Sequence, residues 1–165
     1  MSKARLQVGP ETPATALLKK NGVTFTEHPY EYEHRGGTRV SSEKLGVPEG
    51  SVIKTLVMQD EDKKPLVVLM HGDREVSTKN LARQIGKKRI EPCALDVAER
   101  HSGYQVGGTS PFGTKKPMPV YVERTILDLP RIWINGGRRG FLVALAPSEF
   151  IRLLHAQPVD VALDK

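Results

Sequence analysis

The sequence of 165 residues has one cysteine, Cys93, only five histidines and no long apolar run. A single cysteine cannot form an internal disulfide, and the scattered histidines lack the spacing of metal ligands, so we expect neither a disulfide nor a metal. The lack of an 18-residue apolar stretch and of a signal-like N-terminus argues against a membrane span or secretion. We therefore expect a soluble, cytoplasmic protein that has no membrane partner and needs no cofactor.

The composition fits one domain with one core, because apolar residues make up 38% of the chain and no repeat or linker divides it. We expect a single domain over residues 1–165, with a loose leader at residues 1–11, where the sequence has no periodicity. The net charge is +6 at pH 7 and the pI is near 9.5. This charge favours a polyanionic partner, because clustered lysines and arginines release counterions from phosphates. We expect that partner to be RNA and not DNA.

The spacing of apolar residues and of turn residues predicts short helices and strands along the whole chain. Helices are predicted over residues 13–20, 40–45 and 95–101, over a segment between Ser77 and Gly86, and over a segment that begins at Pro147. Strands are predicted over residues 23–30, 51–59, 65–71, 73–76, 89–92, 119–124, 131–135 and 141–146. Residues 135–140, N-G-G-R-R-G, are predicted to form the turn between the last two strands, with Arg138 and Arg139 at its tip.

Lys54 is an unusual residue for its position. The strand predicted at residues 51–59, S-V-I-K-T-L-V-M-Q, is otherwise apolar on both faces, as in a strand from the middle of a sheet. An ammonium removed from water is costly unless it is paired or faces a wet cavity. Lys54 therefore either extends out of the sheet along its aliphatic stem or lines a polar pocket, and the pattern favours the pocket. Tyr30, at the end of the preceding edge strand, is either a pocket wall or an ordinary sheet residue.

The segment from Gly103 to Lys116, G-Y-Q-V-G-G-T-S-P-F-G-T-K-K, predicts a shaped loop that can offer backbone N–H groups to a ligand. It is not a phosphate-binding P-loop, because Thr114 and not a lysine follows Gly113. It is also not a nucleophile elbow, because Phe112 stands where the second glycine of that motif is required. A tight connection between two elements is the alternative interpretation.

Three motifs in this order resemble the YbaK-like family: V-I-K-T-L-V in a strand, the G-Y-x-V-G-G-x-S-P-x-G-x-K-K loop, and G-G-R-R-G near the end. The resemblance runs from about residue 12 to 162. It implies an α+β fold in which short helices surround a mixed, barrel-like β-sheet. Its members are stand-alone relatives of the editing domain of bacterial prolyl-tRNA synthetases, and this subgroup deacylates tRNA-Pro that is mischarged with cysteine.

The resemblance also implies the site residues. It assigns the family lysine to Lys54 and the tyrosine of the early strand to Tyr30. The loop residues that would hold the aminoacyl ester are Gly107, Gly108, Thr109, Ser110 and Pro111, of which Gly107 and Gly108 would supply amide donors. Departures from the family pattern are H-P-Y-E-Y-E in the early strand, Asn135 in place of a serine, and Leu142 in place of an aspartate. Asn135 is retained as a substrate-binding candidate, and these changes affect the expected substrate preference.

The expected chemistry needs no protein nucleophile, because an aminoacyl ester is already activated and the substrate's own thiol can attack its carbonyl. Cys93 would then be a spectator. Removal of alanine, which has no sulfur, is the alternative reaction, and a non-catalytic domain that binds tRNA or a nucleotide is the alternative class. Mischarged tRNA-Pro is the expected partner, and prolyl-tRNA synthetase is a second candidate. The expected phosphate contacts are Lys115, Lys116, Arg138 and Arg139.

Overall fold

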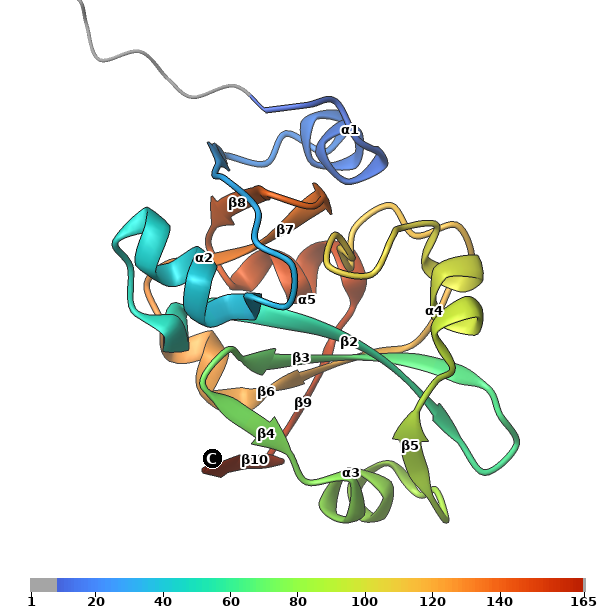
Figure 1. Ribbon diagram of the computed structural model, residues 1–165. Coiled ribbons are helices and arrows are strands. Elements are labelled where there is room, and N and C mark those ends of the chain that lie inside the picture. Colours follow the sequence, from blue (N-terminus) through green and yellow to red (C-terminus); the bar gives the residue numbers. More distant parts are fainter. Residues whose placement is uncertain (1–8, 165) are drawn as a thin grey trace, which may run out of the picture.

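The computed structural model describes residues 9–164 (Figure 1). Its helices are α1 (Pro13–Lys20), α2 (Gly37–Leu45), α3 (Thr78–Ile85), α4 (Leu95–Ser102) and α5 (Ser148–Leu154), with 3₁₀ turns η1 (Glu49–Ser51) and η2 (Arg124–Asp128). Its strands are β1 (Thr26–Pro29), β2 (Val52–Asp60), β3 (Pro65–His71), β4 (Arg74–Val76), β5 (Ile90–Pro92), β6 (Val120–Glu123), β7 (Ile132–Arg138), β8 (Phe141–Leu145), β9 (Gln157–Val159) and β10 (Ala162–Asp164).

The strands within residues 9–164 form one large mixed sheet and one small one. The large sheet has the order β1-β8-β7-β2-β3-β6-β9, with β5 paired to one end of β2, and β4 pairs with β10 in the small sheet. The pairs β2–β7, β3–β6 and β6–β9 are parallel, whereas β1–β8, β7–β8 and β2–β3 are antiparallel. The expected α+β fold with a mixed sheet is confirmed. Among the described residues, β1 and β9 are the edge strands of the large sheet and do not pair with each other.

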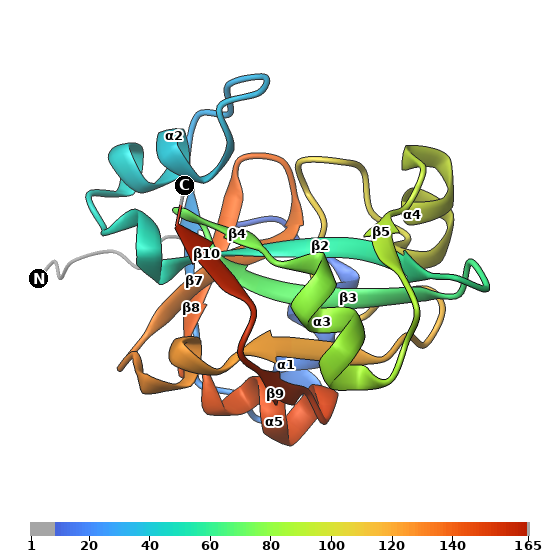
Figure 2. The same cartoon turned by 90° about the horizontal axis from the view of Figure 1, so that it is seen from below.

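The core lies on both faces of β3, because successive side chains of a strand point to opposite faces. Val67 and Leu69 belong to a cluster that includes the stacked rings of Phe112 and Phe150, 5.9 Å apart. Leu66, Val68 and Met70 belong to a second cluster, which α3 covers together with β9 and the end of the chain (Figure 2). The continuous apolar sequence of β3 therefore reflects its burial on two sides.

Several predicted boundaries are confirmed. The helix at residues 13–20 and the strand at residues 65–71 have the predicted ends, and Thr12 caps α1 by accepting a hydrogen bond from Thr15 N at 3.0 Å. β1 is shorter than predicted, but it lies at an edge of the sheet, as the proline in it requires.

Other elements differ from the prediction. β7 does not end at Asn135, because a bulge between Asn135 and Arg138 carries the strand through the two glycines and leaves only Arg139 and Gly140 for the turn. η2, β9 and β10 were not predicted. Most of the leader expected at residues 1–11 lies outside the described residues, and within it Gly9 N donates to Glu27 Oε1 at 3.1 Å.

Candidate functional site

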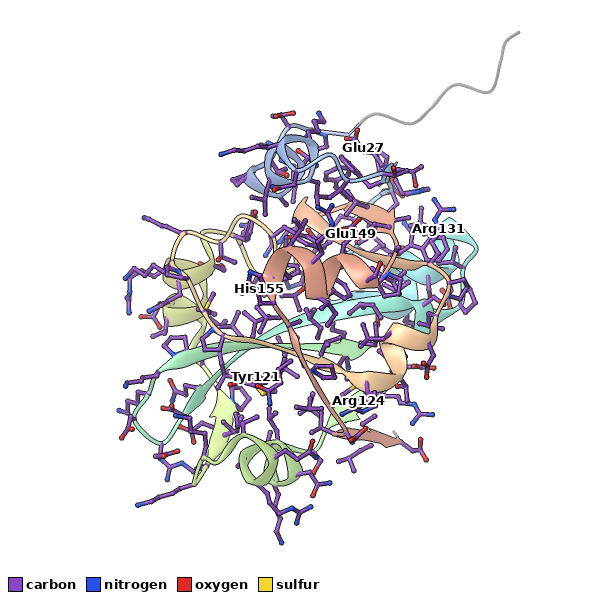
Figure 3. All side chains as sticks on the ribbon, turned by 180° about the vertical axis from the view of Figure 1, so that it is seen from behind. Glu27, Tyr121, Arg124, Arg131, Glu149 and His155 are labelled. Carbon is purple, nitrogen blue, oxygen red and sulfur yellow. The ribbon has the colours of Figure 1, made fainter. Side chains whose placement is uncertain are left out.

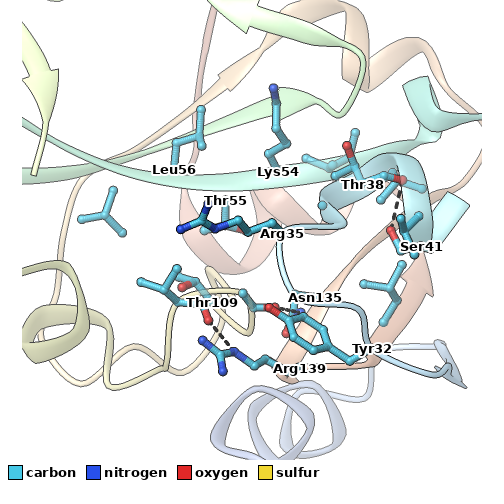
Figure 4. Close-up of a pocket in the computed structure, with 18 of the residues that line it drawn as sticks. Tyr32, Arg35, Thr38, Ser41, Lys54, Thr55, Leu56, Thr109, Asn135 and Arg139 are labelled. Carbon is cyan, nitrogen blue, oxygen red and sulfur yellow. Dashed lines mark hydrogen bonds between the residues drawn. The ribbon is translucent and has the colours of Figure 1, made fainter. Parts of the chain in front are cut away.

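A cavity lies next to the large sheet, at a gap in the pairing of β2. On the edge away from β3, the pairings found within residues 9–164 are those of Val52 and Ile53 with β7 and of Met58–Asp60 with β5. The stretch from Lys54 to Val57 lies between them and lines a cavity of about 530 Å³ (Figure 4). The bulge in β7 begins at Asn135, directly after Ile134, the last residue of β7 found paired with β2, so the gap and the bulge lie side by side.

The open edge of β2 presents backbone groups to the cavity. Val52 O accepts from Gly72 N on the β3 side at 2.7 Å, whereas Val57 O accepts from Cys93 N on the opposite side at 3.2 Å. Because peptide groups alternate in direction along a strand, the N–H and C=O of Thr55 point to the same edge as those of Val57, away from β3 and into the gap between β7 and β5. The hydroxyl of Thr55 is buried and has no hydrogen-bond partner among the described residues. The main-chain groups of this edge can therefore form hydrogen bonds with a ligand.

Lys54 lines the cavity, and its ammonium donates to the carbonyl of Arg74 in β4 at 2.6 Å. Figure 4 shows its side chain directed away from the glycine-rich loop that carries Thr109. Lys54 therefore lies at a pocket, as its sequence position indicated. In this conformation, however, its ammonium and the glycine-rich loop lie on different sides of the cavity. Rotation about the four-carbon stem would be needed to bring them together.

The glycine-rich loop between α4 and β6 is held in shape by side chains around it. Tyr104 Oη donates to Phe112 O at 2.6 Å, and burial raises the pKa of Tyr104 to about 12. Asn135 Nδ2 donates to Gly107 O at 3.1 Å. Gly107 has φ +90°, which favours glycine, and a Cβ there would lie 2.8 Å from the Tyr32 hydroxyl. The loop is thus a rigid wall of the cavity.

Residues 30–36, between β1 and α2, form a segment that we call the strap, and it lies across the cavity from β2. Tyr30 N donates to Gly140 O at 2.8 Å. The Tyr32 ring faces the guanidinium of Arg139 at 5.3 Å, and Arg139 Nε donates to Val106 O at 2.8 Å. Tyr32 and Arg139 therefore connect the strap to the glycine-rich loop.

Six of the predicted site residues line the cavity: Tyr30, Lys54, Gly107, Thr109, Asn135 and Arg139. Gly108, Ser110 and Pro111 are buried behind the loop surface. The amide of Gly108 donates to Gln105 O at 2.8 Å, and Ser110 Oγ accepts from Phe112 N at 3.2 Å. In this structure these groups form hydrogen bonds within the loop, and Gly108, Ser110 and Pro111 are not among the residues that line the cavity.

Two of the predicted phosphate contacts, Arg139 and Lys116, line different cavities. Arg138 is exposed at the end of β7, next to the cavity residue Arg139. Lys116 instead lines a second cavity, of similar volume, together with Lys64, Lys87 and Tyr121. Tyr121 is seen from behind the molecule in Figure 3, which also shows Arg124 after β6 and Arg131 before β7. Arg138 and Arg139 thus lie at the first cavity or beside it, and Lys116 lies at the second.

Sequence reasoning missed several lining residues. Tyr32 and Arg35 belong to a charged loop without periodicity, and Thr55 was read only as part of an apolar strand. Cys93 also lines the cavity, and burial raises the pKa of its thiol, which keeps the thiol protonated at neutral pH. Within residues 9–164 there is no group of three metal-ligating side chains. In the same range no helix has the length and apolar character of a membrane span.

A family model described as "Aminoacyl-tRNA editing domain" matches residues 37–153, which hold α2, β2, the glycine-rich loop and β7. The chain therefore belongs to the aminoacyl-tRNA editing domain family, in agreement with the resemblance read from its motifs. Its activity class is the editing of aminoacyl-tRNA.

Individual relatives agree with this assignment. The chain is 30% identical over 163 residues to "Putative Cys-tRNA(Pro)/Cys-tRNA(Cys) deacylase EbsC" of Enterococcus faecalis, with 98% of each chain covered. It is 38% identical over 71 residues to a proline–tRNA ligase of Pelotomaculum thermopropionicum, a match that covers 43% of this chain and 12% of the ligase.

Solved structures show the same fold. The structure titled "Crystal structure of a putative trans-editing enzyme for prolyl tRNA synthetase" has a TM-score of 0.80 and 22% identity, with 94% of this chain and 99% of that chain covered. At this level of identity the likeness concerns the fold alone.

Proposed function

We propose that this protein deacylates mischarged aminoacyl-tRNA and that its substrate is tRNA-Pro carrying cysteine. The observation that carries the proposal is the cavity, which combines Lys54, the open edge at Thr55 and the glycine-rich loop. The E. faecalis relative, whose printed name includes Cys-tRNA(Pro), supports this choice of substrate. A role in translation also favours a cytoplasmic location, with prolyl-tRNA synthetase as the source of the mischarged tRNA and a candidate partner.

The cavity suits an ester that needs positioning more than it needs a nucleophile. The hydroxyl of Ser110 is buried and engaged, and the Cys93 thiol is protonated. In the proposed reaction, the substrate's sulfur attacks its own carbonyl carbon and a cyclic thioester forms. The ester bond to the terminal ribose breaks, and the ribose oxygen receives the proton that the thiol gives up. Water then opens the ring to give free cysteine.

The protein's contribution to this reaction is orientation and charge stabilisation. The backbone N–H of Thr55 and the loop at Gly107 would hold the aminoacyl group across the cavity. Lys54, released from its bond to the Arg74 carbonyl, would contact the ribose or a phosphate and stabilise the negative charge that develops on oxygen.

A discharge assay with tRNA-Pro that carries cysteine, serine or alanine tests the proposal. A thiol with a few per cent thiolate is a far better nucleophile than a hydroxyl near neutral pH. Cysteine should therefore be released well, and serine should be released more slowly by more than the ~10–200-fold that discrimination by size alone provides. The Cys93→Ala protein should retain this activity.

Rapid release of both serine and alanine would contradict the sulfur-assisted route. It would indicate an activated water and would assign this chain, with Asn135 and Leu142 in its cavity, to alanine removal. No release of any of the three amino acids would contradict the deacylase assignment as a whole.

A further inference from the structure

The cations that line or border the cavity have different surroundings. Lys54 donates to the Arg74 carbonyl, and Arg139 donates to the Val106 carbonyl and faces the Tyr32 ring. Arg35 differs from both, because no hydrogen bond or ion pair to it is found within residues 9–164. Figure 4 shows its side chain extending across the cavity between β2 and the glycine-rich loop. Its guanidinium is therefore available to a ligand.

The acidic groups around the cavity do not compete for Arg35. Glu33 is the acidic residue among those that line the cavity in the described part of the chain. It pairs with Lys44 of α2 at 3.0 Å, and Glu31 also pairs with Lys44 at 3.5 Å. The carboxylates of the strap are thus directed to α2, and the charge that faces the cavity from the strap is the positive charge of Arg35.

The backbone conformation of Arg35 is unusual for its residue type. Its φ is +62°, in the left-handed region that L-residues with a Cβ seldom occupy. Gly36 N donates to Glu33 O at 3.0 Å and closes the turn in which Arg35 lies. This turn places the exposed side chain over the cavity (Figure 4). An uncommon conformation of this kind is a reason to look for a ligand.

We propose that Arg35 forms a phosphate-binding subsite at the mouth of the cavity. Its ligand is the phosphodiester group that joins the terminal adenosine of aminoacyl-tRNA to the preceding nucleotide. The inference rests on the proposed function. A cavity of about 530 Å³ is of the size that holds a small-molecule ligand, here an aminoacyl nucleoside, so the adjoining phosphate would lie at the exposed mouth. A guanidinium matches a phosphate with two parallel N–H···O bonds.

Binding of adenosine 5′-monophosphate and of adenosine, measured by calorimetry, tests the subsite without any need for catalysis. The unaltered protein should bind the monophosphate about tenfold or more tightly than adenosine, which is the range for a hydrogen bond to a charged group. Arg35→Ala should remove that preference and leave adenosine binding unchanged. Arg35→Lys should restore part of it, because the charge returns without the planar fork.

Arg39→Ala provides a matched control, because Arg39 lies on α2 outside the cavity lining and pairs with Glu43 at 3.4 Å. It should keep the full preference for the monophosphate. A preference that survives in Arg35→Ala, or its absence from the unaltered protein, would overturn the subsite.

A second measurement uses cysteinyl-tRNA with a neutral methylphosphonate at the terminal linkage. The unaltered protein should deacylate it with a kcat/KM about tenfold or more below that for the normal linkage, whereas Arg35→Ala should cleave both substrates equally. An equal loss in both proteins would overturn the subsite. A protein that binds the monophosphate through Arg35 but deacylates nothing would retain the subsite and lose the proposed function.

Discussion

Lys54 is the residue on which the proposed chemistry depends most, and its removal gives a direct test. Lys54→Ala and Lys54→Met should each lower kcat for deacylation by about 10²–10³-fold, because a charge that stabilises the transition state is lost. The fold should remain, since the side chain is only partly buried. Discharge assays and thermal unfolding should be compared with Lys79→Ala, a change on the exposed face of α3. Full activity in a folded Lys54→Ala protein would refute the role.

Thr55 provides a second test at the scale of one residue, because its buried hydroxyl lacks a partner among the described residues. Thr55→Val keeps the shape of the side chain and removes the hydroxyl. The free energy of unfolding should stay the same or rise, since an unsatisfied polar atom is removed. Deacylation should fall severalfold if the hydroxyl bonds to the substrate.

Thr125→Val is the matched control for Thr55→Val, because the Thr125 hydroxyl bonds to Glu123 Oε2 at 2.9 Å and to His71 Nε2 at 2.7 Å. This change should lower the free energy of unfolding by about 1 kcal/mol and leave deacylation unchanged. Chemical denaturation and the discharge assay together separate the two threonines. Unchanged activity in Thr55→Val would mean that the hydroxyl has no part in binding.

At the scale of elements, Glu123 at the end of β6 connects that strand to the C-terminal segment. It is buried, and its Oε1 accepts from Val161 N at 2.8 Å and from Ala162 N at 2.9 Å. Burial acts to raise the pKa of Glu123, but hydrogen bonds from Val161, Thr125 and Ala162 outweigh it and hold the pKa below its usual range.

This lowered pKa predicts an acid-dependent loss of stability. A group whose pKa is lower in the folded state stabilises the fold above its unfolded pKa, about 4.3 for glutamate, and this contribution is lost as the pH falls through the folded value. Glu123→Gln should therefore be less stable than the unaltered protein at pH 7, and the difference should shrink below pH ~4. Urea denaturation over a pH series would show this, and a constant difference would contradict it.

The sequence predicted elements well where both ends carry turn residues. β3 lies between a polar turn and Gly72, and α1 lies between Thr12 and Gly22, so their limits could be read directly. β9 and β10 are three residues each, too short for a period of two to be recognised, and they depend on distant partners in β6 and β4. The bulge in β7 was missed because its two glycines are equally typical of a turn.

The location of the site could be predicted from the sequence, but the directions in which its side chains point could not. The lysine in an apolar strand identified the cavity wall, yet nothing in the sequence fixed the side on which its ammonium lies. Gly108 and Ser110 are residues typical of a ligand-binding loop, but their polar groups form hydrogen bonds within the loop. Tyr32 and Arg35 could not be selected from sequence, because their role depends on how the strap crosses the cavity.

At the scale of the whole molecule, the separation of the basic groups predicts different contributions to tRNA binding. Arg138 is exposed beside the cavity, whereas Lys116 lines the second cavity. Arg138→Glu should raise the KM for aminoacyl-tRNA and reduce the salt dependence of binding, because a phosphate contact near the acyl end is lost. The double change of Lys115→Glu and Lys116→Glu, measured in the same way, tests contacts with the body of the tRNA.

A change at Lys20 serves as a control for charge alone, because Lys20 is an exposed residue in the last turn of α1. Lys20→Glu alters the net charge by the same amount as Arg138→Glu and should have little effect on KM. KM and binding should be measured at several salt concentrations. Equal effects of the Lys20 and Arg138 changes would show that only the net charge matters.

The pairing of β1 with β8 and of β2 with β7 has a consequence for how the protein is made. Both pairings join a strand that begins in the first third of the chain to a strand from the last third. Contacts so distant in sequence form slowly, and they cannot form while the later strand is still inside the ribosome. A chain whose translation stops before β7 would therefore have no cavity and could not compete with the finished protein for tRNA.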